Sequence, residues 1–566
     1  MKEEKGSSLS LTPEMVTQEE SGFPSKLDWR KLSVFLQSHI WLILLGTSCE
    51  VVYLVYLLHD FPLLGHYHDL TDMGIINGYS HTGFLKFQIG SSILFLLFGL
   101  ACYEVRRSHD RMSLPIIFAF GALFAVTLIF VYPVTAIDVF IYIAQSLVLV
   151  QHHANPMVTA PVQFANQDPL MYLAGGFITQ PSPYGPLGVV IAAIPSLIAG
   201  KNVLLTLVLI KVLFSALLLT TAFLVYKVLS ALGAAFALVG AIALAWNPFV
   251  LFEYVVNSHN DIVMVFFLVV AVYALTKERY VLALTLVMAS ALIKFASFPV
   301  VPLFFLYGLF QQPSLQKRLR YIAFGILIPA LFTIACFVPF WAGPQTLARV
   351  LNQTQDQLYS FSMFLTDFSS GTISANSVKV IGMVFFGGCF LYALWKAQEN
   401  LAGLLEGCFL TLFSLLAFGV TYIQVWYLLW PLVFAILIPR TRTYLAAFLL
   451  AYAALIVELV HAYIFPWGGY ANADTFAIVN SVVYLVLFSP TLLLGVVHFF
   501  VKGRGGRIRE KDREEANRED ESQEEQTRAE YADVPGERRD ARRAGDDPME
   551  KRAPVGDMAR ARSGGR

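Results

Sequence analysis

The chain has few charged residues and few cysteines for its length of 566 residues. Only 14% of its residues are Asp, Glu, Lys or Arg, whereas soluble proteins carry roughly a quarter. The five cysteines all lie inside apolar runs and form no paired motif. We therefore expect them to be small buried residues rather than functional groups, and we expect the chain not to be a soluble protein.

Several signals of other protein classes are missing. The sequence has no Walker A motif and no repeat of about 20–50 residues, so ATP-driven transport has no support. We expect no cleavable signal peptide, because the first 35 residues are polar and end in a basic patch. Its formal net charge is zero, and much of the charge lies after Val501. The charge balance thus gives no indication of nucleic-acid binding.

Long apolar runs dominate the remainder of the chain. Of all residues, 57% are hydrophobic, and the mean hydropathy is +0.62. Runs of about 15–25 residues are each long enough to cross a hydrocarbon core roughly 30 Å thick. They predict an all-α polytopic membrane protein with about 14 spans, within a domain of residues 36–501. Residues 135–187 interrupt the runs and form the longest predicted loop.

Basic residues set the predicted orientation. Lys and Arg cluster in alternate connections between the runs, which places those connections and both termini in the cytoplasm. The other connections, including residues 135–187, then face outward. Residues 1–35 and 502–566 lack apolar periodicity, so we expect disordered cytoplasmic segments there. The basic connections contain Arg106, Arg107, Arg111, Lys227, Lys277, Arg279, Lys317, Arg318, Arg320, Lys396, Arg440 and Arg442.

An acidic residue stands at the predicted outer end of the third run. Asp138 follows the run that ends at Val134, and Tyr142 and Gln145 come next at helical spacings. Apolar residues between them predict a helix along the membrane surface whose polar side faces a cavity. A carboxylate at a membrane boundary is costly unless it is solvated, paired or used. A simple boundary carboxylate or a helix N-cap is the alternative.

A second polar cluster lies in a predicted outer turn between two runs. Its members are Glu253, Asn257, His259, Asn260 and Asp261. Turn and capping preferences account for Asn and Asp, but they do not account for His259 beside Asp261. A metal site is not favoured, because these two residues offer too few ligands.

Lys294 interrupts a strongly apolar segment, also toward the predicted outer side. The side chain either snorkels to the interface or supplies a cation for a phosphate, and the sequence does not decide between them. Two further features lie on this side: a rigid turn at Gln180–Pro186 and an aromatic cluster at Gln424–Pro431. The aromatic cluster is typical of an interfacial belt and equally of a wall against a sugar or a lipid.

Together these motifs resemble a known family. In chain order they are Ile137-Asp138-x3-Tyr142, Asn155-Pro156, Tyr184-Gly-Pro-Leu, Trp246-Asn-Pro, His259-Asn-Asp261, Lys294 to Pro299, and Gln424-x-Trp-Tyr to Trp430-Pro431. Over roughly residues 115–440 the chain resembles GT-C superfamily membrane glycosyltransferases, most closely the bacterial polyprenol-phosphate-mannose-dependent mannosyltransferases. It departs from their pattern in two places. The acidic outer loop follows the third span rather than the first, and Ser258 stands where Gly is more familiar.

The resemblance implies a GT-C-like bundle in the plasma membrane, with its active site on the extracytoplasmic face. Such an enzyme moves a hexose, here mannose, from a polyprenyl-phosphate donor to a glycolipid or glycan acceptor, with inversion and without a metal or another cofactor. Asp138 is then the expected base for the acceptor hydroxyl. Lys294, and secondly Arg349, are expected to stabilise the departing phosphate. The other expected substrate-binding residues are Tyr142, Tyr184, His259, Asn260 and Asp261.

A polytopic transporter or lipid flippase is the main alternative, since intramembrane Asp and Lys residues also mark ion and substrate paths. The sequence shows no inverted repeats and no matching pair of Gly- or Pro-broken spans, which argues against it. A non-catalytic membrane scaffold would leave the polar clusters of the outer face unexplained.

Overall fold

The structure is a computed structural model, and it describes residues 29–108, 110–233, 235–352, 357–469 and 474–494. Across these ranges the chain is almost entirely helical. They contain two isolated β-bridges and no strand. The predicted all-α class is confirmed for these residues. The predicted N-terminal segment overlaps the first helix at residues 29–35. The rest of that segment, and the predicted tail 502–566, lie outside the described residues.

Eight helices in the described ranges are long and apolar enough to cross a membrane, and a bent helix pair brings the number to nine. The long helices are α1 (Trp29–Val52) with η1 (Tyr53–Leu58), α4 (His81–Ser108), α8 (Val203–Ala231), α14 (Leu315–Phe337) with η6 (Val338–Phe340), α17 (Ala375–Ala397), α18 (Leu401–Ser414) with η9 (Leu415–Gly419), α20 (Thr441–Leu459) with η11 (Val460–Gly469), and Asp474–Leu494.

Shorter helices complete the bundle and its loops. The apolar ones are α5 (Ser113–Ile129), α6 (Asp138–Val150), α7 (Pro186–Ala199), α11 (Asp261–Leu275), α12 (Tyr280–Ala291), η5 (Phe295–Val300) with α13 (Val301–Phe310), and η10 (Val425–Leu428) with α19 (Leu429–Leu437). The remaining helices are α2 (Leu63–His66), α3 (Met73–Ile76), η2 (Pro161–Phe164), η3 (Pro169–Phe177), α9 (Ala237–Ala245), α10 (Pro248–Leu251) with η4 (Phe252–Val256), η7 (Pro344–Leu347), α15 (Ala348–Asn352) and α16 (Phe361–Phe368).

The predicted run 235–256 is a bent helix pair, with α9 and the α10–η4 segment meeting at 43°. Pro248 has no amide hydrogen, so it cannot continue the hydrogen bonding of α9 and instead starts a new helix. Asn247 is extended and its side chain accepts from the Phe249 amide at 3.1 Å, which caps that new helix. The sequence Asn247-Pro248 therefore ends α9 and begins α10.

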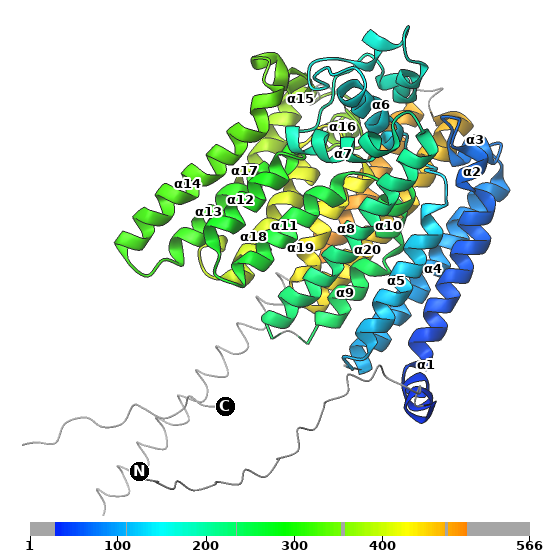
Figure 1. Cartoon of the computed structure of the whole chain (residues 1–566), viewed down its shortest axis with the longest axis horizontal. Coiled ribbons are helices and arrows are strands. Elements are labelled where there is room, and N and C mark those ends of the chain that lie inside the picture. Colours follow the sequence, from blue (N-terminus) through cyan, green and yellow to red (C-terminus); the bar gives the residue numbers. More distant parts are fainter. Residues whose placement is uncertain (1–28, 109, 234, 353–356, 470–473, 495–566) are drawn as a thin grey trace, which may run out of the picture. The chain divides into compact units, whose positions relative to one another are not determined.

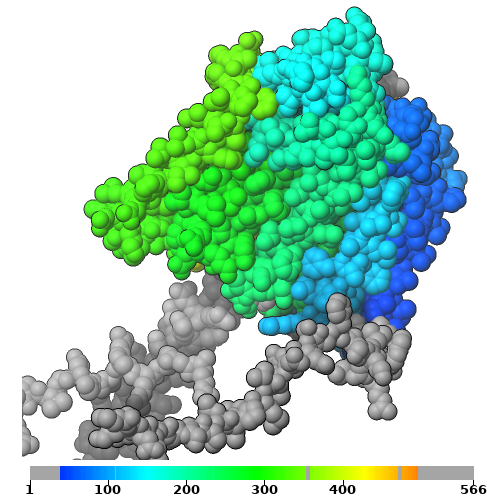
Figure 2. Space-filling view, viewed as in Figure 1, coloured from blue at the N-terminus to red at the C-terminus, as the bar shows by residue number. Residues whose placement is uncertain are grey.

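Apolar side chains cover the outer surface of the bundle, as expected for contact with lipid. In α14 and α17 only 17% of the most apolar window is buried, and exposed residues such as Leu319, Ile326 and Leu331 follow one another along α14. This helix lies along one edge of the molecule (Figures 1 and 2). A soluble protein does not expose so much contiguous apolar surface, so the pattern supports a membrane protein.

The long predicted loop folds as a compact layer at one end of the bundle. Helices α6 and α7 lie at this end, together with α2, α3, α15 and α16 (Figure 1). Helix α6 packs against η3, α7 and α8, and its residues 139–148 are all buried. The predicted helix at Asp138–Val150 thus exists, and its position along a membrane surface stays a prediction.

Candidate active site

Asp138 is the first residue of α6, and the backbone before it is held by a distant side chain. The amides of Val134 and Thr135 donate to Asn257 Oδ1 at 3.1 and 3.4 Å. Ile137 is the N-cap residue and makes no side-chain capping bond, so the alternative that Asp138 caps the helix is wrong. The Asp138 side chain remains 22% exposed. That exposed part borders two cavities.

The two cavities share a wall and differ in their chemistry. The amide cavity, of about 430 Å³, is bordered by Gln145, Gln180 and Gln424 and by Arg349. The lysine cavity, of about 260 Å³, is bordered by Lys294 and by apolar groups. The wall that both share consists of Asp138, Pro183, Tyr184, Tyr422, Trp426 and Tyr427. A molecule in either cavity would therefore reach the Asp138 carboxyl group.

The turn between η4 and α11 lies directly beneath Asp138. His259 is fully buried, and its Nδ1 lies 3.9 Å from Asp138 Oδ1. The imidazole stacks on Trp426 with ring centroids 3.8 Å apart. Ser258, which precedes it, has φ 59°. Glycine adopts such a positive φ readily, which agrees with the Gly that is more familiar at this position in the family that the chain resembles.

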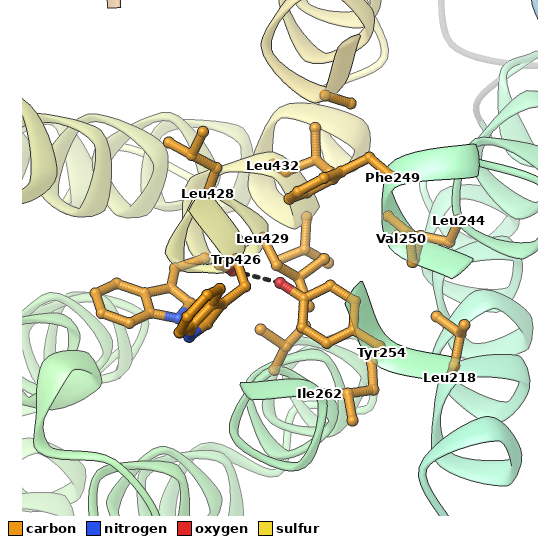
Figure 3. Packing of buried hydrophobic residues seen from close by; sticks show 14 of the residues in the cluster. Leu218, Leu244, Phe249, Val250, Tyr254, Ile262, Trp426, Leu428, Leu429 and Leu432 are labelled. Atoms are coloured by element: carbon orange, nitrogen blue, oxygen red, sulfur yellow. Dashed lines mark hydrogen bonds between the residues drawn. The ribbon is translucent and has the colours of Figure 1, made fainter. Parts of the chain in front are cut away.

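Buried apolar packing fixes the aromatic side of the turn. Tyr254 on η4 donates a hydrogen bond to the Trp426 carbonyl oxygen (Figure 3). Leu429 and Ile262 lie around the same tyrosine ring in this cluster (Figure 3). This bond holds the backbone of Trp426, whose ring stacks on the imidazole of His259.

Lys294 points into the lysine cavity, although its charge is paired. Its Nζ lies 2.8 Å from Asp261 Oδ1 and 4.2 Å from the centre of the Tyr427 ring. Trp430 Nε1 donates to the same Asp261 oxygen at 2.5 Å. Since Asp261 is fully buried and Lys294 is 15% exposed toward the cavity, the snorkelling alternative is not supported. The ammonium group is held where an anion in the cavity would meet it.

The environment of Asp138 makes it a stronger base than an ordinary aspartate. Burial raises the pKa of Asp138 from 3.8 to about 6, Lys294 acts against this rise, and Asp261 adds to it. Burial and the nearby Lys294 charge hold the pKa of His259 well below its usual value, so the imidazole is neutral at pH 7. The site therefore presents an ionised carboxylate with raised proton affinity beside a neutral imidazole at that pH.

Two tyrosines join the wall to the turn. Tyr184 Oη lies 3.5 Å from Tyr142 Oη, and the Asn260 amide donates to Tyr142 Oη at 3.4 Å. Burial raises the pKa of both tyrosines well above 10, so their hydroxyl groups stay protonated. Gly185 places Tyr184 here, since a Cβ at Gly185 would meet the Leu292 carbonyl oxygen at 2.1 Å.

The predicted site residues thus fall into three groups. Asp138, Tyr184 and Lys294 border the lysine cavity. Arg349 on α15 borders the amide cavity. The remaining predicted residues, Tyr142, His259, Asn260 and Asp261, are buried behind the walls rather than bordering either cavity. The structure therefore gathers all of them around Asp138, with the buried members in position to hold the exposed ones.

Three residues to which the sequence assigned no site role also support the site, and one of them, Glu253, belongs to the predicted polar cluster of the outer turn. Glu458 on α20 borders the amide cavity, and Glu253 Oε2 lies 3.3 Å from His259 Nε2. Lys211 on α8 is fully buried and donates to the carbonyl oxygens of residues 255 and 256, at the end of η4. Each one interrupts an apolar run. An ionisable residue inside a span is costly unless it is used, and this was the signal available in the sequence.

The geometry can be set beside known proteins. Residues 68–309 match the model of a family described as alpha-(1->6)-mannopyranosyltransferase, N-terminal domain. This region is similar to a mannosyltransferase family. No curated protein matches the chain. Together with the candidate spans, the family match supports a membrane mannosyltransferase. The matched region includes Asp138, the turn at His259 and Lys294, whereas Trp426 and Glu458 lie beyond it.

Proposed function

We propose that this membrane mannosyltransferase takes mannose from a polyprenyl-phosphate donor and transfers it, with inversion, to a glycan or glycolipid acceptor. One observation carries the proposal: Asp138 stands on the wall between two cavities of different chemistry. A two-substrate transfer needs a base at the point where the substrates meet. A transporter path needs no such wall.

The lysine cavity suits the donor. Its cation, Lys294, would bind the phosphate, and apolar neighbours such as Phe295, Ala296 and Val420 would contact the prenyl chain. As the bond between the sugar and the phosphate breaks, negative charge grows on the phosphate oxygens. A fixed ammonium group stabilises that growing charge more than it stabilises the donor itself, which lowers the barrier. Arg349 is the second candidate for this role, from the side of the amide cavity.

The amide cavity suits the acceptor. Gln145, Gln180 and Gln424 each offer a donor and an acceptor of hydrogen bonds, as sugar hydroxyl groups require. The indole of Trp426 adds an apolar face on the shared wall. An acceptor bound here would present a hydroxyl group to Asp138 from the side opposite the donor phosphate.

The proposed step is a single displacement. The acceptor oxygen attacks the anomeric carbon of mannose and forms the new glycosidic bond. The bond between that carbon and the phosphate oxygen breaks, and its electron pair stays on the phosphate. Asp138 takes the hydroxyl proton, for which a pKa of about 6 suits a base at neutral pH. Because phosphate leaves as a stable anion, the step needs no general acid.

We further propose a GT-C-like bundle of about 14 spans. The long helices, the bent pair and the shorter apolar helices other than α6 and α7 would supply them. In this arrangement both termini, including segments 1–35 and 502–566, face the cytoplasm. The cavities then open on the extracytoplasmic face of the plasma membrane, with α6 at the interface. Cysteine labelling of the basic connections and of the 135–187 loop from either side of sealed vesicles tests this orientation.

The function itself is tested with purified protein in lipid vesicles. We expect labelled mannose to move from polyprenyl-phosphate mannose to a mannan-type acceptor, and not from a nucleotide sugar. Asp138→Asn should abolish most of this transfer. Release of labelled donor lipid to the opposite leaflet without any glycosidic product would instead support a flippase.

A further inference from the structure

The amide cavity has a second wall that the proposed reaction step does not use. Besides the residues around Asp138, the cavity is bordered by Leu70, Thr71, Asp72 and Ile75. They come from the loop between η1 and α4, far from Asp138 in the sequence. None of these four described residues borders the lysine cavity. With the substrates placed as proposed, this loop would contact the acceptor and not the donor.

Hydrogen bonds tie the loop to the segment that leads to Asp138. The Met73 amide donates to the Val134 carbonyl oxygen at 2.8 Å, and the Thr71 amide donates to Tyr132 Oη at 3.2 Å. Val134 precedes Asp138 by four residues, and four extended residues span at most about 14 Å. The loop is therefore fixed a short way along the cavity from the proposed base.

The loop is also packed closely against the end of α20. A Cβ at Gly74 on α3 would meet the Ala462 carbonyl oxygen of η11 at 2.1 Å. Asn77 Nδ2, just after α3, donates to Tyr463 Oη at 3.0 Å. His461, next to Ala462, borders the amide cavity as well. The wall that the loop forms thus continues into η11, and both parts hold each other in place.

Asp72 can serve the fold and a ligand together. It is the N-cap of α3, and its Oδ1 accepts from the Ile75 amide at 2.8 Å. A carboxylate has two oxygens with about four acceptor sites between them, so the cap does not exhaust its capacity. Thr71 adds a hydroxyl group at the same wall, and Leu70 and Ile75 add exposed apolar side chains. Such a surface suits a sugar ring, which has both hydroxyl groups and apolar C–H faces.

The charges of the cavity favour a neutral glycan over an anion at this wall. Three carboxyl groups border the cavity, those of Asp72, Asp138 and Glu458, together with the guanidinium group of Arg349. An anion near Asp72 would be repelled, whereas a hydroxyl group can donate a charge-assisted hydrogen bond to it.

We propose that Thr71 and Asp72 form a second sugar subsite of the amide cavity, which binds the acceptor residue next to the one that receives mannose. The preferred acceptor is then a chain of at least two hexoses rather than a single sugar. Binding of the second hexose would help to hold the attacking hydroxyl group at Asp138, so it would act on transfer as well as on affinity. This inference rests on the proposed function, which places the acceptor in the amide cavity.

The test compares acceptors of different length. Purified protein in lipid vesicles receives polyprenyl-phosphate mannose together with octyl mannoside or with octyl mannobiosides of different linkage. In the wild type, kcat/KM for the best mannobioside should exceed that for the mannoside about 10–100-fold, as expected for one charge-assisted hydrogen bond with its neighbouring contacts. The ratio of these two kcat/KM values is the readout, because a general folding defect would lower transfer to both acceptors and leave the ratio unchanged.

Asp72→Asn separates the two roles of this side chain. Asn caps helices about as well as Asp, so α3 keeps its cap, but the variant loses the charge and one acceptor oxygen. The ratio should fall about tenfold. Thr71→Val keeps the shape of the side chain and removes the hydroxyl group, which should lower the ratio about two- to tenfold. This second variant decides the question where Asp72→Asn is inactive.

Asp69→Asn is the matched control. Asp69 is exposed on the same loop, and it borders neither cavity. Its ratio should match the wild type, since the same change of charge occurs outside the cavity.

The outcomes separate the subsite from the proposed function. Equal kcat/KM for the mannoside and every mannobioside in the wild type would overturn the subsite. Wild-type ratios in both Asp72→Asn and Thr71→Val would do the same. Normal transfer by Asp138→Asn, or no transfer from polyprenyl-phosphate mannose to any acceptor, would instead overturn the proposed function, and the subsite with it.

Discussion

The pH dependence of mannose transfer examines the proposed base most directly. Asp138 must be ionised to accept the hydroxyl proton, and burial raises its pKa from 3.8 to about 6. The active form is therefore the deprotonated one, and activity is lost as the pH falls through about 6. At pH 5 only about a tenth of the enzyme would be ionised, and kcat/KM should drop about tenfold for each further unit. An ordinary exposed aspartate would keep full activity to about pH 5.

Donor binding should shift the acid limb of the pH profile, where activity falls at low pH, to higher pH. A phosphodiester anion beside Lys294 adds negative charge near Asp138, which raises the pKa of the carboxyl group further. The acid limb of kcat, which reports the enzyme–substrate complex, should therefore lie at higher pH than the limb of kcat/KM, which reports the free enzyme. Coincident limbs, or a kcat/KM limb near pH 4, would contradict the proposed environment.

The corresponding substitution removes the base and little else. Asn is nearly the same size as Asp, so Asp138→Asn should lower kcat about 10²–10⁴-fold, equivalent to about 3–5 kcal/mol of barrier. The residual activity should no longer break near pH 6. Asp69→Asn is the control, because Asp69 is exposed beside the same outer loops but borders neither cavity. Single-turnover transfer of labelled mannose over pH 4.5–8.5 compares the three proteins; a fall below about fivefold in Asp138→Asn would refute the assignment.

Three other substitutions probe the parts that hold the site. Lys294→Gln should raise the donor KM and lower kcat about 10–100-fold, whereas Lys294→Arg should retain most activity, as steady-state kinetics with varied donor would reveal. Gly185→Ala forces a Cβ against a backbone oxygen, so the variant should lose about 1–3 kcal/mol of stability in thermal unfolding and transfer less mannose. Gly176→Ala is the control, because a Cβ there would meet nothing within 4 Å, and its stability and activity should match the wild type. Lys211→Met removes a donor from two buried carbonyl groups, of which that of Val255 keeps a hydrogen bond from Ser258 Oγ. The unpaired Val256 carbonyl group should cost about 1–3 kcal/mol and lower the melting temperature by several degrees. Lys227→Met, at an exposed position of the same helix, is its control, and equal melting of the two variants would count against the role of Lys211.

The sequence predicted the exposed part of the site better than its buried support. Asp138 and Lys294 were identifiable because each breaks an apolar pattern near the predicted outer side. The same signal was present at Glu458 and Lys211. Their roles, however, depend on partners 205 or 45 positions away, such as Glu253 and Val256, and no local spacing indicates such contacts.

The places where helices end also depend on contacts that are distant in sequence. The predicted run 279–296 divides into α12 and η5, with Lys294 extended between them at φ −142° and ψ 120°. Apolarity alone cannot locate that break, because it is fixed by tertiary contacts. The amides of Gly185 and Leu187 donate to the carbonyl oxygens of residues 293 and 292, at the end of α12. A loop distant in sequence thus sets where the helix stops.

One short turn determines the distance between the proposed base and the proposed cation. Asn257 holds the backbone before Asp138, and four residues later Asp261 holds Lys294. Lys211 holds the same turn from the opposite side. Outer loops are the more mobile parts of a protein, and a displacement of 1 Å between reacting groups can cost about 100-fold in rate. Anchoring both groups to a fully buried turn removes that dependence on the loops, which explains why so many polar residues are buried at this point of the chain.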